Sequence, residues 1–198
     1  ASTVPTALAS QETREESRTQ KRMARLFDEG DWPVLKKYPQ SHIARIAMPI
    51  GGIGTGTISL GGRGDLRDWE IMNRPSKDFV PSRGEIFPFF VSYIEADGEK
   101  DTRILEGPLS FSEYEGSHGS TAPNDNLPRY QHSAFAAAYP FGQVILHDPL
   151  IPAIIRLKAF NPMVPADAEA SGLPIAVLRY EIINPTNQSI RASICGNI

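Results

Sequence analysis

A cluster of polar side chains around one tryptophan contains the residue types that ligand binding needs. The cluster comprises Arg63, Asp65, Arg67, Asp68, Trp69, Glu70, Asn73 and Arg74. An aromatic ring can stack on the C–H groups of a sugar, while charged and amide groups bind its hydroxyls. We therefore take four of these residues as candidates for substrate binding: Asp65, Arg67, Trp69 and Asn73.

The same cluster also allows a purely structural interpretation. Alternation along a strand would turn Trp69 inward, while Asp68 and Glu70 pair with Arg67 or Arg74 at the surface. Both interpretations fit the spacing.

Carboxylate pairs that could hydrolyse a glycosidic bond are present, but their surroundings argue against that role. Examples are Glu113 with Glu115, and Asp65 with Asp68. A general acid needs an apolar pocket that raises its pKa, whereas these residues lie in polar, glycine-rich segments. We therefore expect solvated acids.

No motif in the chain indicates a metal, a nucleotide or another cofactor. The histidines are scattered, without local metal-ligand spacing, at His42, His118, His132 and His147. The glycines at 52, 54 and 56 lack the dinucleotide-binding spacing, and the Thr/Ile alternation after them predicts a strand instead of a phosphate-binding helix. The sequence also lacks the Gly-x-Ser-x-Gly motif of esterases. We expect neither a metal nor a cofactor.

Seven glycines lie within residues 51–64, at positions 51, 52, 54, 56, 61, 62 and 64. Glycine at this density indicates backbone that adopts positive φ or approaches another surface closely. The alternation that follows predicts a strand with Ile58 and Leu60 on one face.

Length, charge and hydropathy exclude several classes of protein. The 198 residues suggest one domain, or one and a half. A net charge of −3 indicates neither nucleic-acid binding nor a polybasic membrane patch. No apolar run approaches the roughly 18 residues of a membrane helix, and the single cysteine, Cys195, excludes an internal disulfide. The sequence is compatible with a cytoplasmic protein and with a periplasmic or secreted one.

Short apolar runs separated by 17 prolines and 16 glycines predict an all-β fold, an antiparallel β-sandwich. A single helix is expected over residues 10–31, mostly solvated and anchored near its end by Met23, Leu26 and Phe27. We divide the chain into a helical and extended lead-in, residues 1–42, and a β-sandwich domain, residues 43–198.

Several strands and turns can be placed within the sandwich. Alternation at Phe87, Phe89, Val91 and Tyr93 predicts a strand, and Asp97-Gly98 predicts a hairpin to a strand near residues 102–105. Residues 107–128 should form a long surface loop. A continuous apolar face is expected at Ile151, Ala153, Ile155, Leu157 and Ala159. The last strand reaches Ile198 without a closing turn, so we expect the sandwich to be incomplete at its C-terminus.

Glycine and proline landmarks follow one another in a fixed order along the chain. They are Pro49–Gly54 with Gly56 and Gly61, Arg63-Gly64 with Trp69 and Asn73, Tyr139–Gly142 with Asp148, Phe160–Pro162 with Val164-Pro165, Ser171–Pro174, and Tyr180–Pro185. This series resembles the N-terminal domain of family 116 glycoside hydrolases, the bacterial β-glucosidase and non-lysosomal glucosylceramidase group. The resemblance covers about residues 46 to 198.

The resemblance implies a sandwich of the galactose-mutarotase-like supersandwich type, packed on a C-terminal (α/α)6 barrel. In that family the barrel holds a glutamate nucleophile and an aspartate acid/base for retaining hydrolysis of β-linked glucose. No position here matches either carboxylate, so the resemblance implies no catalytic residue in this chain. The chain would be a scaffold, with Asp65, Arg67, Trp69 and Asn73 at the cleft rim or the domain interface.

The implied partners are the C-terminal catalytic domain and the carbohydrate or glycolipid substrate, with a homodimer as a further candidate. The alternative function is a free-standing carbohydrate-binding sandwich without catalysis.

Overall fold

The computed structural model describes residues 14, 17–19, 21–23, 25–27, 35–71, 74–82, 87–114, 120 and 122–198. Within them, eleven strands form three antiparallel sheets, and the helical segments are short. The expected all-β sandwich is therefore confirmed. Among the described residues, no helix has the length and apolar character needed to cross a membrane.

The largest sheet has five strands in the order β1-β7-β8-β9-β10. Its strands are β1 (Lys36–Tyr38), β7 (His132–Ala138), β8 (Phe141–His147), β9 (Ile154–Phe160) and β10 (Val177–Ile183). The 42/43 boundary expected from sequence falls after β1, so the lead-in contributes a strand to this sheet. Residues 130–139, whose sequence fits either a strand or a short helix, contain the strand β7.

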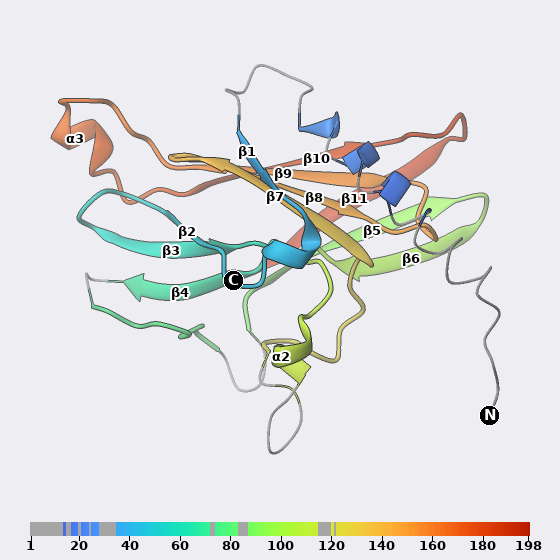
Figure 1. Ribbon diagram of the computed structural model, residues 1–198, viewed down its shortest axis with the longest axis horizontal. Coiled ribbons are helices and arrows are strands. Elements are labelled where there is room, and N and C mark those ends of the chain that lie inside the picture. Colours follow the sequence, from blue (N-terminus) through green and yellow to red (C-terminus); the bar gives the residue numbers. More distant parts are fainter. Residues whose placement is uncertain are drawn as a thin grey trace.

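Two three-stranded sheets form the opposite layer, side by side beneath the five-stranded sheet (Figure 1). One has the order β2-β3-β4, with β2 (Ala47–Ile50), β3 (Gly56–Gly61) and β4 (Leu66–Ile71). The other has the order β11-β5-β6, with β5 (Phe89–Ala96), β6 (Glu99–Ile104) and β11 (Ile190–Asn197).

The main hydrophobic core lies between these two layers. The apolar face predicted over residues 151–159, at and before β9, is confirmed, because all five of its residues, from Ile151 to Ala159, are at most 4% exposed and belong to this core. From the facing sheets come Ile50 of β2, Leu60 of β3 and Ile94 of β5. Strand β5 alternates as predicted, but its buried face carries Ser92 and Ile94 instead of Val91 and Tyr93.

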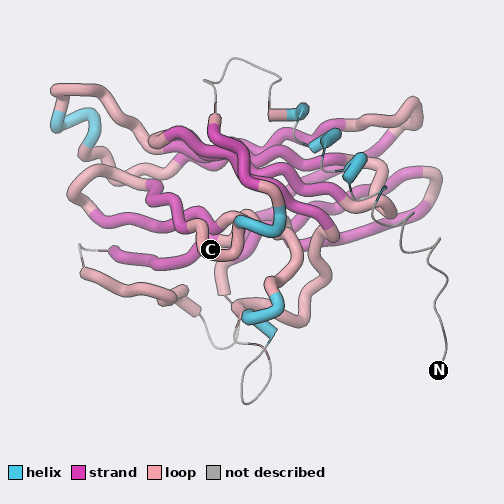
Figure 2. Tube along the Cα trace, viewed as in Figure 1, coloured by secondary structure: helices cyan, strands magenta, loops and turns pink. Residues whose placement is uncertain are grey.

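The predicted N-terminal helix is helical at residues 14, 17–19, 21–23, 25 and 26. Its expected anchors Met23, Leu26 and Phe27 are buried in a second cluster on the other face of the five-stranded sheet. Figure 2 shows these N-terminal helical segments on the side of this sheet away from the smaller sheets. Nη2 of Arg156 donates to the Leu26 carbonyl at 2.6 Å, which binds the end of the helix to β9.

The glycine run behaves as its density predicts. Positions 51, 54, 56 and 64 have positive φ. At 52, 61 and 62 another residue fills the space that a Cβ would occupy. At Gly52 the space is filled by Oγ1 of Thr55 and by the backbone oxygen of Leu173, and the second contact shows how closely the β2–β3 turn lies against the segment after α3 (Ala168–Ser171).

The loops differ more from expectation than the strands do. The Asp97-Gly98 hairpin is confirmed, with positive φ at both residues as a type I′ turn requires. Residues 107–128, however, are not only surface loop. The loop begins with the buried Gly107 and Leu109 and contains the short helix α2 (Phe111–Tyr114).

Candidate functional site

The turn between β3 and β4 carries the first part of the polar cluster. The Gly61 amide donates to the Asp65 carbonyl at 2.8 Å, and the Gly64 amide donates to the Gly61 carbonyl at 3.0 Å. The Arg63 carbonyl accepts from the Gly107 amide at 2.7 Å, which joins the turn to the segment after β6. The Arg63 and Asp65 side chains therefore start from a fixed backbone.

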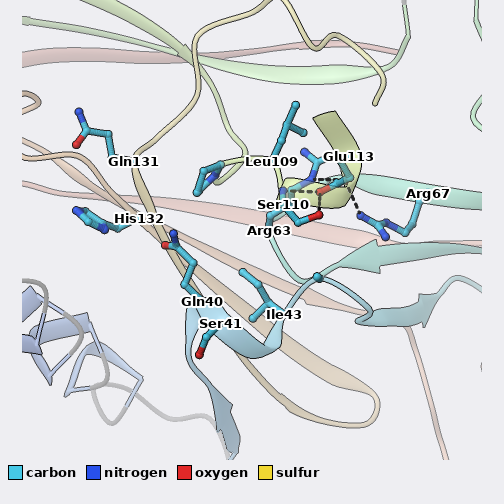
Figure 3. A pocket seen from close by; sticks show the side chains of 12 residues that line it. Gln40, Ser41, Ile43, Arg63, Arg67, Leu109, Ser110, Glu113, Gln131 and His132 are labelled. Atoms are coloured by element: carbon cyan, nitrogen blue, oxygen red, sulfur yellow. Dashed lines mark hydrogen bonds and ion pairs between the residues drawn. The ribbon is translucent and has the colours of Figure 1, made fainter. Parts of the chain in front are cut away.

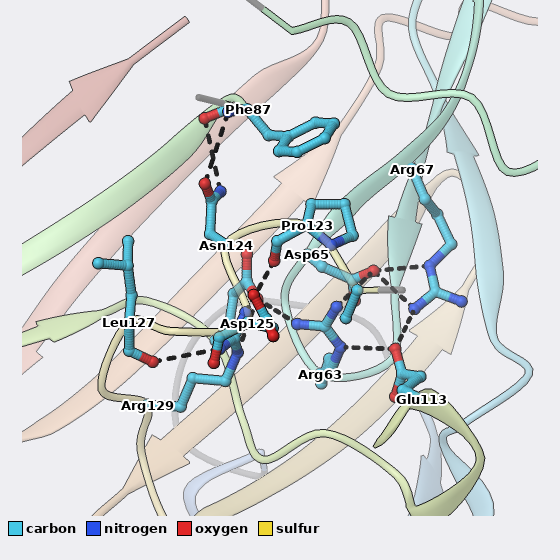
Figure 4. A network of polar contacts seen from close by, with 12 residues as sticks. Arg63, Asp65, Arg67, Phe87, Glu113, Pro123, Asn124, Asp125, Leu127 and Arg129 are labelled. Carbon is cyan, nitrogen blue, oxygen red and sulfur yellow. Dashed lines mark hydrogen bonds and ion pairs between the residues drawn. The ribbon is translucent and has the colours of Figure 1, made fainter. Parts of the chain in front are cut away.

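Arg63 is the centre of a network of ion pairs (Figure 4). Its Nη1 contacts Oε2 of Glu106, its Nε lies 3.3 Å from Oε1 of Glu113, and its Nη2 lies 3.6 Å from Oδ2 of Asp65. On the outer side, Nε and Nη2 of Arg67 each lie 2.6 Å from the same Asp65 oxygen. One guanidinium thus joins three acids, and a second guanidinium closes the network toward solvent.

Arg129 completes the network from the loop before β7. Its Nε lies 3.2 Å from Oε2 of Glu106. Its remaining nitrogens donate to backbone carbonyls of Pro123 at 2.9 Å, Leu127 at 3.1 Å and Asp125 at 3.3 Å. We name the six residues Arg63, Asp65, Arg67, Glu106, Glu113 and Arg129 the arginine–carboxylate cluster.

Burial and charge act in opposite directions on the pKa values of this cluster. Burial alone would lower the Arg63 pKa, but the nearby carboxylates raise it overall. Burial raises the pKa of Glu106, and the opposing attraction of Arg63 and Arg129 does not cancel this effect. For Glu113, burial would raise the pKa, but Arg63 and two hydrogen bonds from Ser110 lower it.

A hollow lies on each side of the cluster. The first, about 470 Å³, separates the cluster from the 3-10 helix η1 (Gln40–His42) and is lined by Arg63, Arg67, Glu113, Ser41 and Gln131 (Figure 3). The second, about 540 Å³, lies against residues 78–80 and 87–88 and shares the same two arginines and Glu113. We name the second the aromatic hollow because Phe79 and Phe87 line it.

The expectation of solvated acids is wrong for this part of the chain. Asp65 is 6% exposed and Asp68 is 4% exposed, while Glu113 is half-buried in the cluster. Sequence reasoning treated glycine-rich segments as exposed, whereas these glycines allow other parts of the chain to cover the acids. Glu115 lies outside the described residues.

The four candidate binding residues are only partly brought together. Asp65 and Arg67 are in direct contact and both line the aromatic hollow. Trp69 lines neither hollow, and Asn73 lies outside the described residues.

A β-bulge explains why Trp69 is separated from Arg67. Thr57 pairs with Glu70 and Ser59 pairs with Arg67, so β4 contains one additional residue between them, with Asp68 at a positive φ of 49°. Thr57 and Ser59 lie on the same face of the sheet, so their partners Glu70 and Arg67 also lie on one face. Trp69 is next to Glu70 in the strand and therefore points to the opposite face from Arg67.

The two acids of β4, Asp68 and Glu70, pair with residues of the 74–82 segment and not with the arginines that the structural interpretation of the sequence predicted. Asp68 accepts from the Asp78 amide at 2.8 Å, and Glu70 accepts from the Ser76 amide at 3.2 Å. Lys77 pairs with both acids, at 3.8 and 3.3 Å. Asp68 and Glu70 therefore hold residues 74–82 beside β4 instead of pairing with Arg67 or Arg74.

Sequence reasoning missed Glu106 and Arg129 as members of the site. Glu106 lies in the segment after β6 and Arg129 follows a polar loop, so no local motif distinguishes them. Among the described residues, no three His, Cys, Asp or Glu side chains are grouped so that they could hold a metal ion.

Comparison with protein-family models matches residues 47–198 to the model described as beta-glucosidase 2, glycosyl-hydrolase family 116 N-term. Comparison with curated proteins finds no similar sequence.

Proposed function

The chain belongs to glycosyl-hydrolase family 116 through the N-terminal domain formed by residues 47–198, and on this premise we propose that it is the non-catalytic domain of a retaining β-glucosidase or glucosylceramidase-like enzyme. Its partner would be a C-terminal (α/α)6 catalytic domain of the same protein. The domain would serve as a scaffold for this partner and place Asp65 and Arg67 at the rim of the substrate cleft.

The observation that carries this proposal is that arginines bind all three acids of the cluster. Retaining hydrolysis needs one carboxylate free to attack the sugar and a second carboxyl group, roughly 5–5.5 Å away, that carries a proton. Asp65 is bound by Arg67, and Glu113 is bound by Arg63. Neither is free as a nucleophile.

Glu106 is the one acid of the cluster whose raised pKa resembles that of a general acid. Its Oε2, however, accepts from both Arg63 and Arg129. A proton on this oxygen would displace two charged donors, so its chemistry favours a structural carboxylate. The acids that cleave the substrate are therefore expected outside this chain.

The side chains at the rim suit a substrate-facing role. Arg67 lines both hollows and is partly exposed, with 22% of its side chain accessible, and Asp65 fixes its guanidinium. A positioned guanidinium can donate to sugar hydroxyls without the entropy cost of a mobile side chain.

The test is hydrolysis of an aryl β-glucoside by the purified 198-residue chain and by the parent enzyme that contains the catalytic domain. We expect turnover by the parent and none by the chain alone. Turnover by the pure chain that is lost in Glu106→Gln or Glu113→Gln would refute the proposed division of labour.

A further inference from the structure

We propose that the aromatic hollow is itself a binding site for a neutral sugar, with Phe79 and Phe87 as its stacking surface and Arg67 and Asp78 as its polar groups. The inference rests on the proposed function and deepens it, because it names a ligand class and a subsite within this domain.

The first wall of the hollow is an exposed aromatic ring on a fixed backbone. Phe79 is 51% exposed, although contact between a large apolar side chain and water is unfavourable. Its carbonyl accepts from the Trp69 amide at 2.9 Å, and the neighbouring Asp78 amide donates to Asp68. The ring therefore projects from a segment that is hydrogen-bonded to β4.

A second part of the lining is held in a similar way. Two hydrogen bonds join the Phe87 backbone to the Asn124 side chain (Figure 4). The Phe87 amide donates to Oδ1 of Asn124, and Nδ2 of Asn124 donates to the Phe87 carbonyl, both at 3.5 Å. Pro88, Ala122 and Pro123 extend this apolar surface. A sugar ring carries C–H groups on its faces, and these can pack on such aromatic and proline surfaces.

The polar groups of the hollow can bind hydroxyls. Nε and Nη2 of Arg67 are bound by carboxylates, whereas Nη1 has no partner in the described part of the chain, as Figure 4 shows. Asp78 is exposed, and its carboxylate accepts no hydrogen bond from the residues that the structure describes. One directed donor and one acceptor thus remain for a ligand.

Charge selects a neutral ligand over an anion. The hollow is lined by Arg63 and Arg67 and by Asp65, Asp78, Glu106 and Glu113, and Arg129 pairs with Glu106 behind this lining. Three arginines thus neutralise three of the four acids, and the exposed Asp78 leaves an excess of one negative charge. A phosphate or sulfate group would meet net repulsion there, whereas a hydroxylated neutral molecule would not. The volume of about 540 Å³ lies within the range of small-molecule sites, roughly 300–1,000 Å³.

The experiment is calorimetric titration of the 198-residue chain with cellobiose, with inorganic phosphate as the anionic probe. We expect cellobiose to bind and phosphate neither to bind nor to compete. Phe79→Ala should weaken cellobiose binding about two- to tenfold through loss of the stacking surface. Phe79→Trp should retain binding, because it keeps an aromatic face.

Phe111→Ala is the matched control, since Phe111 is 79% exposed and lines neither hollow. The unfolding midpoints of both alanine variants should equal that of the wild type, because both rings are exposed. Equal cellobiose affinity in Phe79→Ala and Phe111→Ala would overturn the inference.

Two other results would also overturn it: no binding of cellobiose to the folded wild-type chain, or binding of phosphate alone. Neither result would contradict the proposed function if the chain remains inactive on the aryl β-glucoside. Hydrolysis by the chain would instead refute the proposed function, whatever the binding result.

Discussion

Arg63 and Glu106 form an ion pair whose two side chains are only 6% and 8% exposed. Arg63 belongs to the β3–β4 turn and Glu106 to the segment after β6, so the pair joins the two three-stranded sheets. Oε2 of Glu106 also lies 3.2 Å from Arg129, which adds the loop before β7 to the same contact. This carboxylate is therefore a junction between three parts of the sandwich.

The Glu106→Gln variant should be destabilised by about 3 kcal/mol, because breaking a buried ion pair leaves charge without compensation. Equilibrium unfolding in urea measures the difference. Glu99→Gln, at an exposed position of β6, is the matched control and should change stability by no more than about 0.5 kcal/mol. Equal stability of the two variants would show that the junction contributes little.

Gly61→Ala should also destabilise the chain, by about 1–3 kcal/mol. Its Cβ would overlap Oδ1 of Asp65 and lie 2.6 Å from Cγ, so Asp65 would have to move away from Arg67. Thermal unfolding of the variant tests this. Gly98→Asn is the control, because a side chain there meets open space and asparagine tolerates the positive φ. A wild-type midpoint in Gly61→Ala would contradict the close approach.

Met23→Ala should cost about 2–5 kcal/mol, as expected for a truncated core side chain. Met23 is 2% exposed and packs in the same cluster as Ile145 and Ile154 of the five-stranded sheet. Arg25→Ala, at an exposed helical position, should leave the free energy of unfolding nearly unchanged. If both variants are as stable as the wild type, the helix does not contribute to the core.

His147 should make stability depend on pH in mildly acidic solution. Burial, together with the charge of the neighbouring His132, lowers the His147 pKa below 6.5. Below pH 6.5 the unfolded chain therefore binds more protons than the folded chain, so stability rises with pH and is lost as pH falls through the folded pKa.

The free energy of unfolding, measured between about pH 5 and pH 7.5, should fall less steeply toward acid in His147→Gln than in the wild type. NMR titration of the His147 ring gives an independent check. A titration midpoint at or above 6.5 would contradict the prediction.

Local sequence determined most of the fold. Alternation identified the β9 face, the dipeptide Asp97-Gly98 identified a hairpin, and Met23, Leu26 and Phe27 identified the buried end of the N-terminal helix. These features follow from backbone periodicity and turn conformation, which depend on neighbours within a few residues. The glycine run likewise indicated positive φ and close approach, although the sequence does not show which residues approach it.

Tertiary structure alone decided the site. Glu106 contacts Arg63 across a separation of 43 residues, and Arg129 contacts Glu106 across 23, and no local pattern encodes such contacts. The extra residue at Asp68 also moved Trp69 out of phase with Arg67, because a single bulge reverses the faces of all residues beyond it. The sequence thus determined which segments are strands. Which acids are buried, and which arginines neutralise them, was decided only when distant segments packed together and water was excluded from between them.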